Sequence, residues 1–178
     1  LEASKHDANT VYAALNNHKM GDFKPYVLVS RNRGKSWSLI SNNLPERGST
    51  YTIVQDHEQP ELLFVGTEFG VFYSADEGGN WVQIKSGMPT IAVRDLAIQQ
   101  RESDLVLATF GRSFYVLDDY SPLRALNAEV MEKEAHIFPI KTAHMYVQDA
   151  PLALNDKAFL GADFYTAPNP PFGATFTY

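Results

Sequence analysis

The sequence predicts an all-β chain built from about three copies of a four-stranded antiparallel unit. A polar turn motif of the form S-x-(D/N)-x-G-x-x-W occurs at residues 30–37 and again at 74–81, 44 positions further on. Each copy lies between two short β-rich runs, and the flanking columns repeat as well. Four-stranded units of about 40–45 residues are typical of β-propeller blades. We therefore interpret the chain as a fragment of a β-propeller.

The turn motif has a chemical explanation at each of its specified positions. Asp or Asn at the third position accepts backbone N–H groups, and Gly at the fifth allows a positive φ. Trp at the eighth position begins the next strand and can pack back over the turn. We expect both tryptophans to be largely buried, and Asp76 to accept N–H groups of its own turn. The residues given this structural role are Ser30, Asn32, Gly34, Trp37, Ser74, Asp76, Gly78 and Trp81.

The repeat sets the expected domain boundaries. The three blades should cover residues 1–48, 49–90 and 91–120 approximately, which makes residues 1–120 the propeller part. In the third unit, residues 118–122 occupy the place of the turn motif but lack its Gly and Trp. Terminal repeats are often atypical, so we interpret this unit as the last blade.

The remaining sequence predicts a different organisation. A short helix is expected over 121–134, because good helix formers follow an Asp/Ser-Pro start signal. Strands are expected at 135–140 and 143–148, so that residues 121–150 pack on the propeller. Residues 151–178 are interpreted as a linker, rich in Ala, Pro, Asn and Gly, and the start of a further β module.

The two turn motifs resemble the Asp-box (BNR) repeat of β-propellers. The run from Ala108 to Asp119, followed by Ser121-Pro122-Leu123-Arg124, is similar to the last blade of bacterial proteins described as sortilin-like or "glycosyl hydrolase, BNR repeat", of the Bacteroidetes type. The resemblance implies a secreted, periplasmic or cell-surface location. Asp boxes occur in enzymes, receptors and assembly factors, so the resemblance is informative about fold and much less so about function.

Composition excludes several functional classes. The net charge is −6 and the basic residues are scattered, which argues against nucleic acid as a partner. No apolar run approaches the roughly 18 residues of a membrane span. Cysteine is absent, which excludes thiol nucleophiles and Cys-based zinc sites. We find no spacing that predicts a metal site or a cofactor, and we interpret His6, His57, His136 and His144 as isolated.

The meander predicts which residues can meet a ligand. The turn motifs join the third and fourth strands of a unit, so the opposite side of the propeller is the expected ligand side. The ligand candidates there are His18, Tyr26, Arg94 and Arg112. Asp95 lies in a predicted innermost strand, where we expect Arg94 or Arg112 to pair with it. A glycosidase needs two carboxylates, for which Glu68 and Asp95 are the weak candidates, and no catalytic residue is assigned.

Three functional hypotheses follow. We favour a non-catalytic propeller that acts as a scaffold or recognition module of a larger secreted or cell-envelope bacterial protein. Its partners would be the remaining blades and a carbohydrate or protein ligand. The alternative is part of a propeller glycoside hydrolase that acts on poly- or oligosaccharides. A sorting receptor or an assembly factor is the third possibility.

Overall fold

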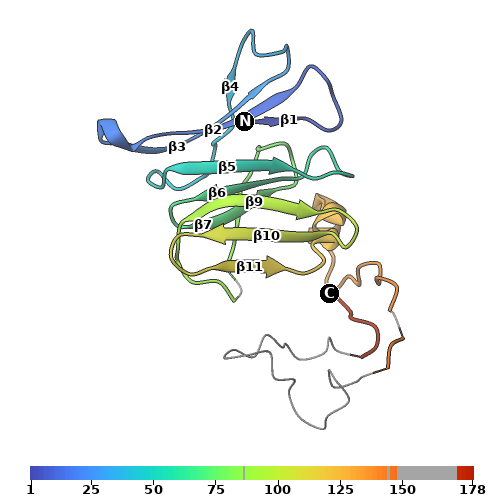
Figure 1. Cartoon of the computed structure of the whole chain (residues 1–178). Helices are drawn as coiled ribbons and strands as arrows, with labels where there is room; N and C mark the ends of the chain where they lie inside the picture. The colour runs from blue at the N-terminus through green and yellow to red at the C-terminus, as the bar shows by residue number, and fades with distance from the viewer. Residues whose placement is uncertain (86, 144, 148–171) are drawn as a thin grey trace. The chain divides into compact units, whose positions relative to one another are not determined.

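Three antiparallel sheets follow one another along the chain (Figure 1). The first contains β1 (Glu2–Ala3), β2 (Val11–Asn17), β3 (Asp22–Ser30) and β4 (Ser38–Leu39) in that order. The second contains β5 (Thr50–Gln55), β6 (Leu63–Thr67), β7 (Gly70–Ser74) and β8 (Val82–Ile84). The third contains β9 (Val93–Gln99), β10 (Asp104–Thr109) and β11 (Phe114–Leu117). The predicted all-β, propeller-like fold is confirmed.

The computed structural model describes residues 1–85, 87–143, 145–147 and 172–178. The chain forms two units, residues 1–132 and 133–178, and the three sheets belong to the first. Two hydrophobic clusters hold these sheets together. One joins the first and second sheets and includes Tyr12, Val27, Val29, Ile53, Val65 and Trp81. The other joins the second and third sheets and includes Phe64, Val71, Val93, Leu96, Leu105 and Tyr120.

Both turn motifs have the same hydrogen-bond pattern. In the second turn, Ser74 Oγ donates to Asp76 Oδ1 and accepts the Gly78 N–H, while Asp76 Oδ1 accepts the Asn80 N–H at 2.7 Å. The first turn has the corresponding bonds among Ser30, Asn32, Gly34 and Ser36. The glycines have φ values of 81° and 89°. The side chains therefore satisfy turn backbone groups that the short β4 and β8 pairings leave unpaired.

Trp81 connects the second sheet to the first. Its indole Nε1 donates to the Ile40 carbonyl at 2.8 Å, and its backbone N–H donates to Asn43 Oδ1. Asn43 Nδ2 donates back to the Trp81 carbonyl, and the Trp81 side chain is buried. At Gly78 an added Cβ would lie 2.9 Å from the Ile40 side chain, so the turn approaches the first sheet closely.

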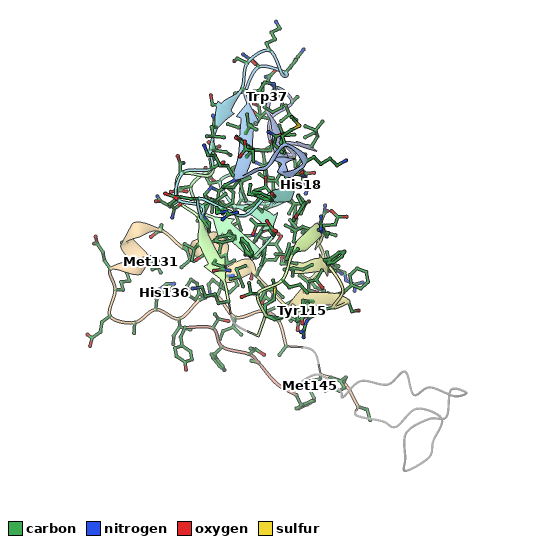
Figure 2. The ribbon with its side chains drawn as sticks, turned by 90° about the vertical axis from the view of Figure 1, so that its left-hand side faces the viewer. His18, Trp37, Tyr115, Met131, His136 and Met145 are labelled. Carbon is green, nitrogen blue, oxygen red and sulfur yellow. The ribbon has the colours of Figure 1, made fainter. Side chains whose placement is uncertain are left out.

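Trp37 occupies the same motif position but is 41% exposed, so the expectation that both tryptophans are buried is wrong for this residue. Trp81 is covered because another sheet precedes its own. No sheet precedes that of Trp37 within the described residues. Figure 2 shows Trp37 at the end of the sheet stack formed by the first unit. The burial of this residue type thus depends on a neighbouring sheet and not on the turn.

The segment after the third sheet differs from the prediction. In place of one helix over 121–134 there are a 3-10 helix, η2 (Ser121–Ala125), and one turn of α1 (Ala128–Met131). Leu126 is extended, with φ −67° and ψ 120°, and Asn127 Oδ1 accepts the Val130 N–H to start the second helix. Local helix propensity is overridden here by contacts of η2 with the second sheet, described below.

The strands predicted at 135–140 and 143–148 are not formed in the described residues 133–143 and 145–147. Strands need a partner for their backbone groups. The Phe138 N–H donates to the Thr177 carbonyl, and this isolated bond does not extend into a ladder. Described residues 172–178 contain no strand either, and residues 148–171 of the expected linker lie outside the described residues. No helix in the described part of the chain is long and apolar enough to cross a membrane.

The two tryptophans allow a matched test of this packing. Trp81→Ala should lower the free energy of unfolding by about 3–5 kcal/mol, because it truncates a buried side chain and removes its hydrogen bond to Ile40. Trp37→Ala should cost less than about 2 kcal/mol, because much of this ring is already in water. Urea denaturation of both variants measures the difference. Equal losses would contradict the assignment of Trp81 as the inter-sheet contact.

Candidate functional site

The ligand face, as we define it, is formed by the β2–β3, β6–β7 and β10–β11 turns and the β4–β5 and β8–β9 links. A groove of about 730 Å³ opens on it beside the first sheet. The groove is lined by residues 21–26 of the long first hairpin, by Leu39, Ser41, Asn42 and Leu44, and by Glu46 and Arg47. The long hairpin therefore forms one wall, and the β4–β5 link forms the other.

Two pairs of side chains define the chemistry of the groove. Tyr26 donates its hydroxyl proton to Asp22 Oδ2 at 2.5 Å, and Asp22 Oδ1 accepts the Lys24 N–H. The Tyr26 hydrogen bond, assisted by the Lys24 N–H, lowers the pKa of Asp22 below its ordinary value. The Arg47 guanidinium lies 5.4 Å from the centroid of the Phe23 ring. The groove thus combines an ionised carboxylate with a stacked cation and an exposed aromatic ring.

The turns of the next two sheets each present a phenylalanine on the same face. Thr67 Oγ1 donates to the Gly70 carbonyl and accepts the Phe69 N–H, which closes the β6–β7 turn. In the β10–β11 turn, Thr109 Oγ1 donates to the Ser113 carbonyl at 2.7 Å. Phe69 and Phe110 are 42% and 68% exposed. A threonine-closed turn therefore leaves an aromatic side chain in solvent in both sheets.

Arg94 lies against two aromatic rings. Its guanidinium carbon is 4.0 Å from the centroid of the Tyr51 ring and 5.1 Å from that of Phe110. The Phe110 N–H donates to the Ala92 carbonyl, which fixes the β10–β11 turn beside the start of β9. Three elements, β5, β9 and this turn, therefore meet at Arg94.

The other sequence-predicted residues are not gathered into one site. His18, in the 3-10 helix η1 (His18–Met20), is exposed and contacts Asn16 Oδ1, and no hydrogen bond joins it to Tyr26 among the described residues. Figure 2 shows His18 at the margin of the first sheet. Arg112 is exposed. Glu68 is fixed through its backbone N–H, which donates to the Ser49 carbonyl.

The expected ion pair of Asp95 with Arg94 or Arg112 is absent from the described residues. Asp95 Oδ1 instead accepts its bonds from Thr52 Oγ1 at 3.4 Å and from the Leu96 N–H. Asp95 is exposed, so water solvates the carboxylate and the predicted requirement for a charged partner does not arise. No group of three or more His, Cys, Asp or Glu side chains suited to a metal ion occurs in the described part of the chain.

Sequence reasoning missed a buried cluster on the opposite side, at the β5–β6 turn. The Asp56 carboxylate is fully buried and accepts both Arg124 Nε, at 2.8 Å, and Arg124 Nη2, at 2.9 Å. It also accepts the Tyr120 hydroxyl and the backbone N–H groups of Glu58 and Gln59. We call Asp56, Tyr120 and Arg124 the clamp. The clamp fastens the start of η2 to the second sheet.

The surroundings of the clamp explain its electrostatics. Burial alone would raise the pKa of Asp56, but the hydrogen bonds from Arg124 and Tyr120 outweigh burial and hold this pKa well below its usual range. Burial and the neighbouring carboxylate raise the pKa of Tyr120. His57 Nδ1 lies 3.4 Å from Asp56 Oδ1, and His6 Nε2 contacts the Asp56 carbonyl, so neither histidine is isolated. The four-residue spacing of Tyr120 and Arg124 was the available sequence signal.

Three solved structures resemble part of this chain. The Niastella koreensis GH74 enzyme matches 65% of this chain and 19% of its own, with a TM-score of 0.52 and 14% identity. An ancestral GH74 enzyme matches 58% of this chain and 15% of its own, with a TM-score of 0.49 and 22% identity. The GH74 xyloglucanase of Xanthomonas campestris matches 58% and 17%, with a TM-score of 0.45 and 15% identity. No family model and no curated protein sequence matches.

The chain spans about a fifth of the length of the Niastella enzyme. At 14% identity this likeness describes the fold alone.

The clamp predicts a specific acid sensitivity. The lowered pKa of Asp56 contributes stability that is fully present above the unfolded-state pKa of about 4 and is lost as the pH falls toward the lower folded-state pKa. Asp56→Asn should therefore flatten the loss of unfolding free energy between pH 5 and pH 3, measured by urea denaturation. Asp118→Asn, at an exposed carboxylate, is the control and should leave the profile unchanged. Identical profiles for Asp56→Asn and the wild type would contradict the clamp.

Proposed function

We propose that this chain is part of an Asp-box β-propeller that acts as a non-catalytic recognition module and binds carbohydrate on the ligand face. The module would belong to a larger secreted, periplasmic or cell-surface bacterial protein, with the remaining blades as its partners. The groove of about 730 Å³ on the ligand face carries this proposal. Sites of this kind combine aromatic side chains with a few polar groups, and the groove has Phe23 and Tyr26 beside Asp22 and Arg47.

The assignment to the Asp-box type is supported by the two turns. Their motif positions carry equivalent hydrogen bonds, with Ser74 Oγ and Asp76 Oδ1 in one turn and Ser30 Oγ and Asn32 Oδ1 in the other. Both turns lie on the side away from the groove. This division supports a structural role for the turns and a binding role for the ligand face.

The pKa of Asp22 and the positions of Glu68 and Asp95 favour recognition over catalysis. Glycosidases need a proton donor, which is a carboxyl group of raised pKa. Asp22, in the groove, is shifted in the opposite direction by Tyr26. Glu68 and Asp95 come from different sheets, and no contact joins them in the described residues. These observations favour binding without hydrolysis.

A glycoside hydrolase is the second candidate, and the fold likeness to the Niastella koreensis GH74 enzyme is the observation in its favour. A shared fold supports many functions, so this likeness alone does not define an activity. In this alternative, Glu68 or Asp95 would supply one carboxylate, and further blades of the parent protein would supply the other. The reaction would be hydrolysis of a poly- or oligosaccharide.

Calorimetric titration with a xyloglucan oligosaccharide and with trigalacturonic acid tests carbohydrate recognition. The double variant Phe23→Ala/Arg47→Ala should weaken binding of at least one of these ligands by about tenfold, since it removes the stacked pair from the groove. Arg31→Ala is the control, because Arg31 pairs with Glu77 on the opposite face. Unchanged affinity in the double variant, or no binding of either ligand, would contradict the proposal.

An activity assay separates the two candidate functions. We expect the chain to release no product from aryl glycosides or xyloglucan. Turnover above background that Glu68→Gln or Asp95→Asn abolishes would overturn the non-catalytic proposal and favour the hydrolase.

A further inference from the structure

A β-bulge occurs at the corresponding place in two neighbouring sheets. In β5 the register shifts at the start of the strand, and Tyr51 is the extra residue without a partner on β6. In β9 the register shifts opposite Ala108 and Thr109, and Arg94 is the extra residue. Bulges redirect side chains and are over-represented next to active sites. The two redirected side chains, Tyr51 and Arg94, contact each other on the ligand face.

The two bulges place Arg94 against aromatic rings and leave the edge of its guanidinium group uncovered. The Arg94 guanidinium lies over the Tyr51 ring at 4.0 Å and near the Phe110 ring at 5.1 Å. Stacking uses the flat face of a guanidinium and leaves its N–H groups, at the edge, available for a planar acceptor. Arg94 is exposed, as is Phe110. The edge of this cation is therefore accessible to a ligand.

The described residues offer those N–H groups no acceptor. On the opposite face, three arginines are paired with carboxylates, Arg31 with Glu77, Arg101 with Glu102, and Arg124 with Asp56, and Arg33 donates to Asn9 Oδ1. The interactions of Arg94 within the described part of the chain are those with the two rings. In a chain with a net charge of −6, an arginine that is oriented but not neutralised indicates an anionic ligand group.

Asp95 narrows the ligand class. Its Oδ1 atom is occupied by Thr52 Oγ1 and the Leu96 N–H, and the described residues give Oδ2 no partner. Asp95 follows Arg94 directly in β9. A carboxylate in this neighbourhood suits a ligand hydroxyl and repels a second negative charge. A ligand with one carboxylate and several hydroxyl groups fits this pair of side chains, whereas a peptide with clustered acidic residues does not.

We propose that Tyr51, Arg94, Asp95 and Phe110 form a subsite for a uronic-acid residue of an acidic oligosaccharide. Arg94 binds the sugar carboxylate through two N–H groups, Phe110 packs against the sugar ring, and Asp95 accepts a ring hydroxyl. This inference rests on the carbohydrate-binding role proposed for the ligand face. Arg47 in the groove and Tyr51 are four residues apart, or at most about 14 Å along the chain, so a short oligosaccharide can span both places.

Calorimetric titration of the whole chain with trigalacturonic acid tests the subsite. Arg94→Ala should weaken binding at least about tenfold, because it removes a charge-assisted bidentate contact. Arg94→Lys should weaken it severalfold, because an ammonium keeps the charge but lacks the planar fork. The fully methyl-esterified trisaccharide should bind the wild type weakly and be insensitive to Arg94→Ala. Arg101→Ala, an exposed arginine at the β9–β10 turn, should bind like the wild type.

Several results would overturn the inference. They are equal affinity of Arg94→Ala and the wild type for trigalacturonic acid, equal binding of the esterified and free acids, and binding of a triglutamate peptide as tight as that of the sugar. Binding that depends on Phe23 and Arg47 but not on Arg94 would overturn the subsite and leave the proposed function intact. Absence of binding to any oligosaccharide would overturn both. A circular dichroism melt of each variant confirms that it is folded.

Discussion

The contact between Trp81 and the first sheet is the interaction on which the arrangement of the sheets depends. A four-stranded sheet with strands this short has little area of its own, so it must bury a face against a neighbour. Trp81 supplies a large apolar ring and also donates its indole N–H to the Ile40 carbonyl. The Asn43 side chain accepts the Trp81 backbone N–H and donates to the Trp81 carbonyl. The contact therefore links the second sheet to the first through both a buried ring and three hydrogen bonds. The loops of the ligand face are positioned by this packing.

The two ends of the sheets use charged side chains differently. On the side of the turn motifs, several charges are neutralised within the protein, most completely at Asp56, where a buried carboxylate is matched by Arg124 and Tyr120. Such an arrangement stabilises a connection and leaves nothing for a ligand. On the ligand face, Arg47 and Arg94 stack on aromatic rings, which orients a cation without neutralising it. This difference, more than any single residue, distinguishes the structural side of the chain from its binding side.

The three sheets could be predicted from the sequence because the motifs that define them are local. The spacing of the turn motifs and the repeated columns around them predict the antiparallel sheets, and Gly34 and Gly78 have the expected positive φ. The exposure of Trp37 and the formation of the clamp could not be predicted in the same way, because each depends on contacts between residues distant in sequence. Asp56 and Arg124 are 68 residues apart. The predicted helix over 121–134 is broken for the same reason, since the clamp holds its first turn.

The sequence predicted on which side of the sheets the candidate site lies, but not the full set of residues that form it. The meander located the ligand face and placed Arg94 on it. The two rings that Arg94 contacts, Tyr51 and Phe110, were not predicted, because a sequence pattern does not reveal the bulges that turn Tyr51 and Arg94 toward each other. The same backbone irregularity presents a tyrosine in the second sheet and an arginine in the third. A repeated fold can thus keep its geometry while each sheet contributes a different chemical group. Residues that interrupt the repeat on the ligand face are therefore more informative about function than the turn motifs that define it.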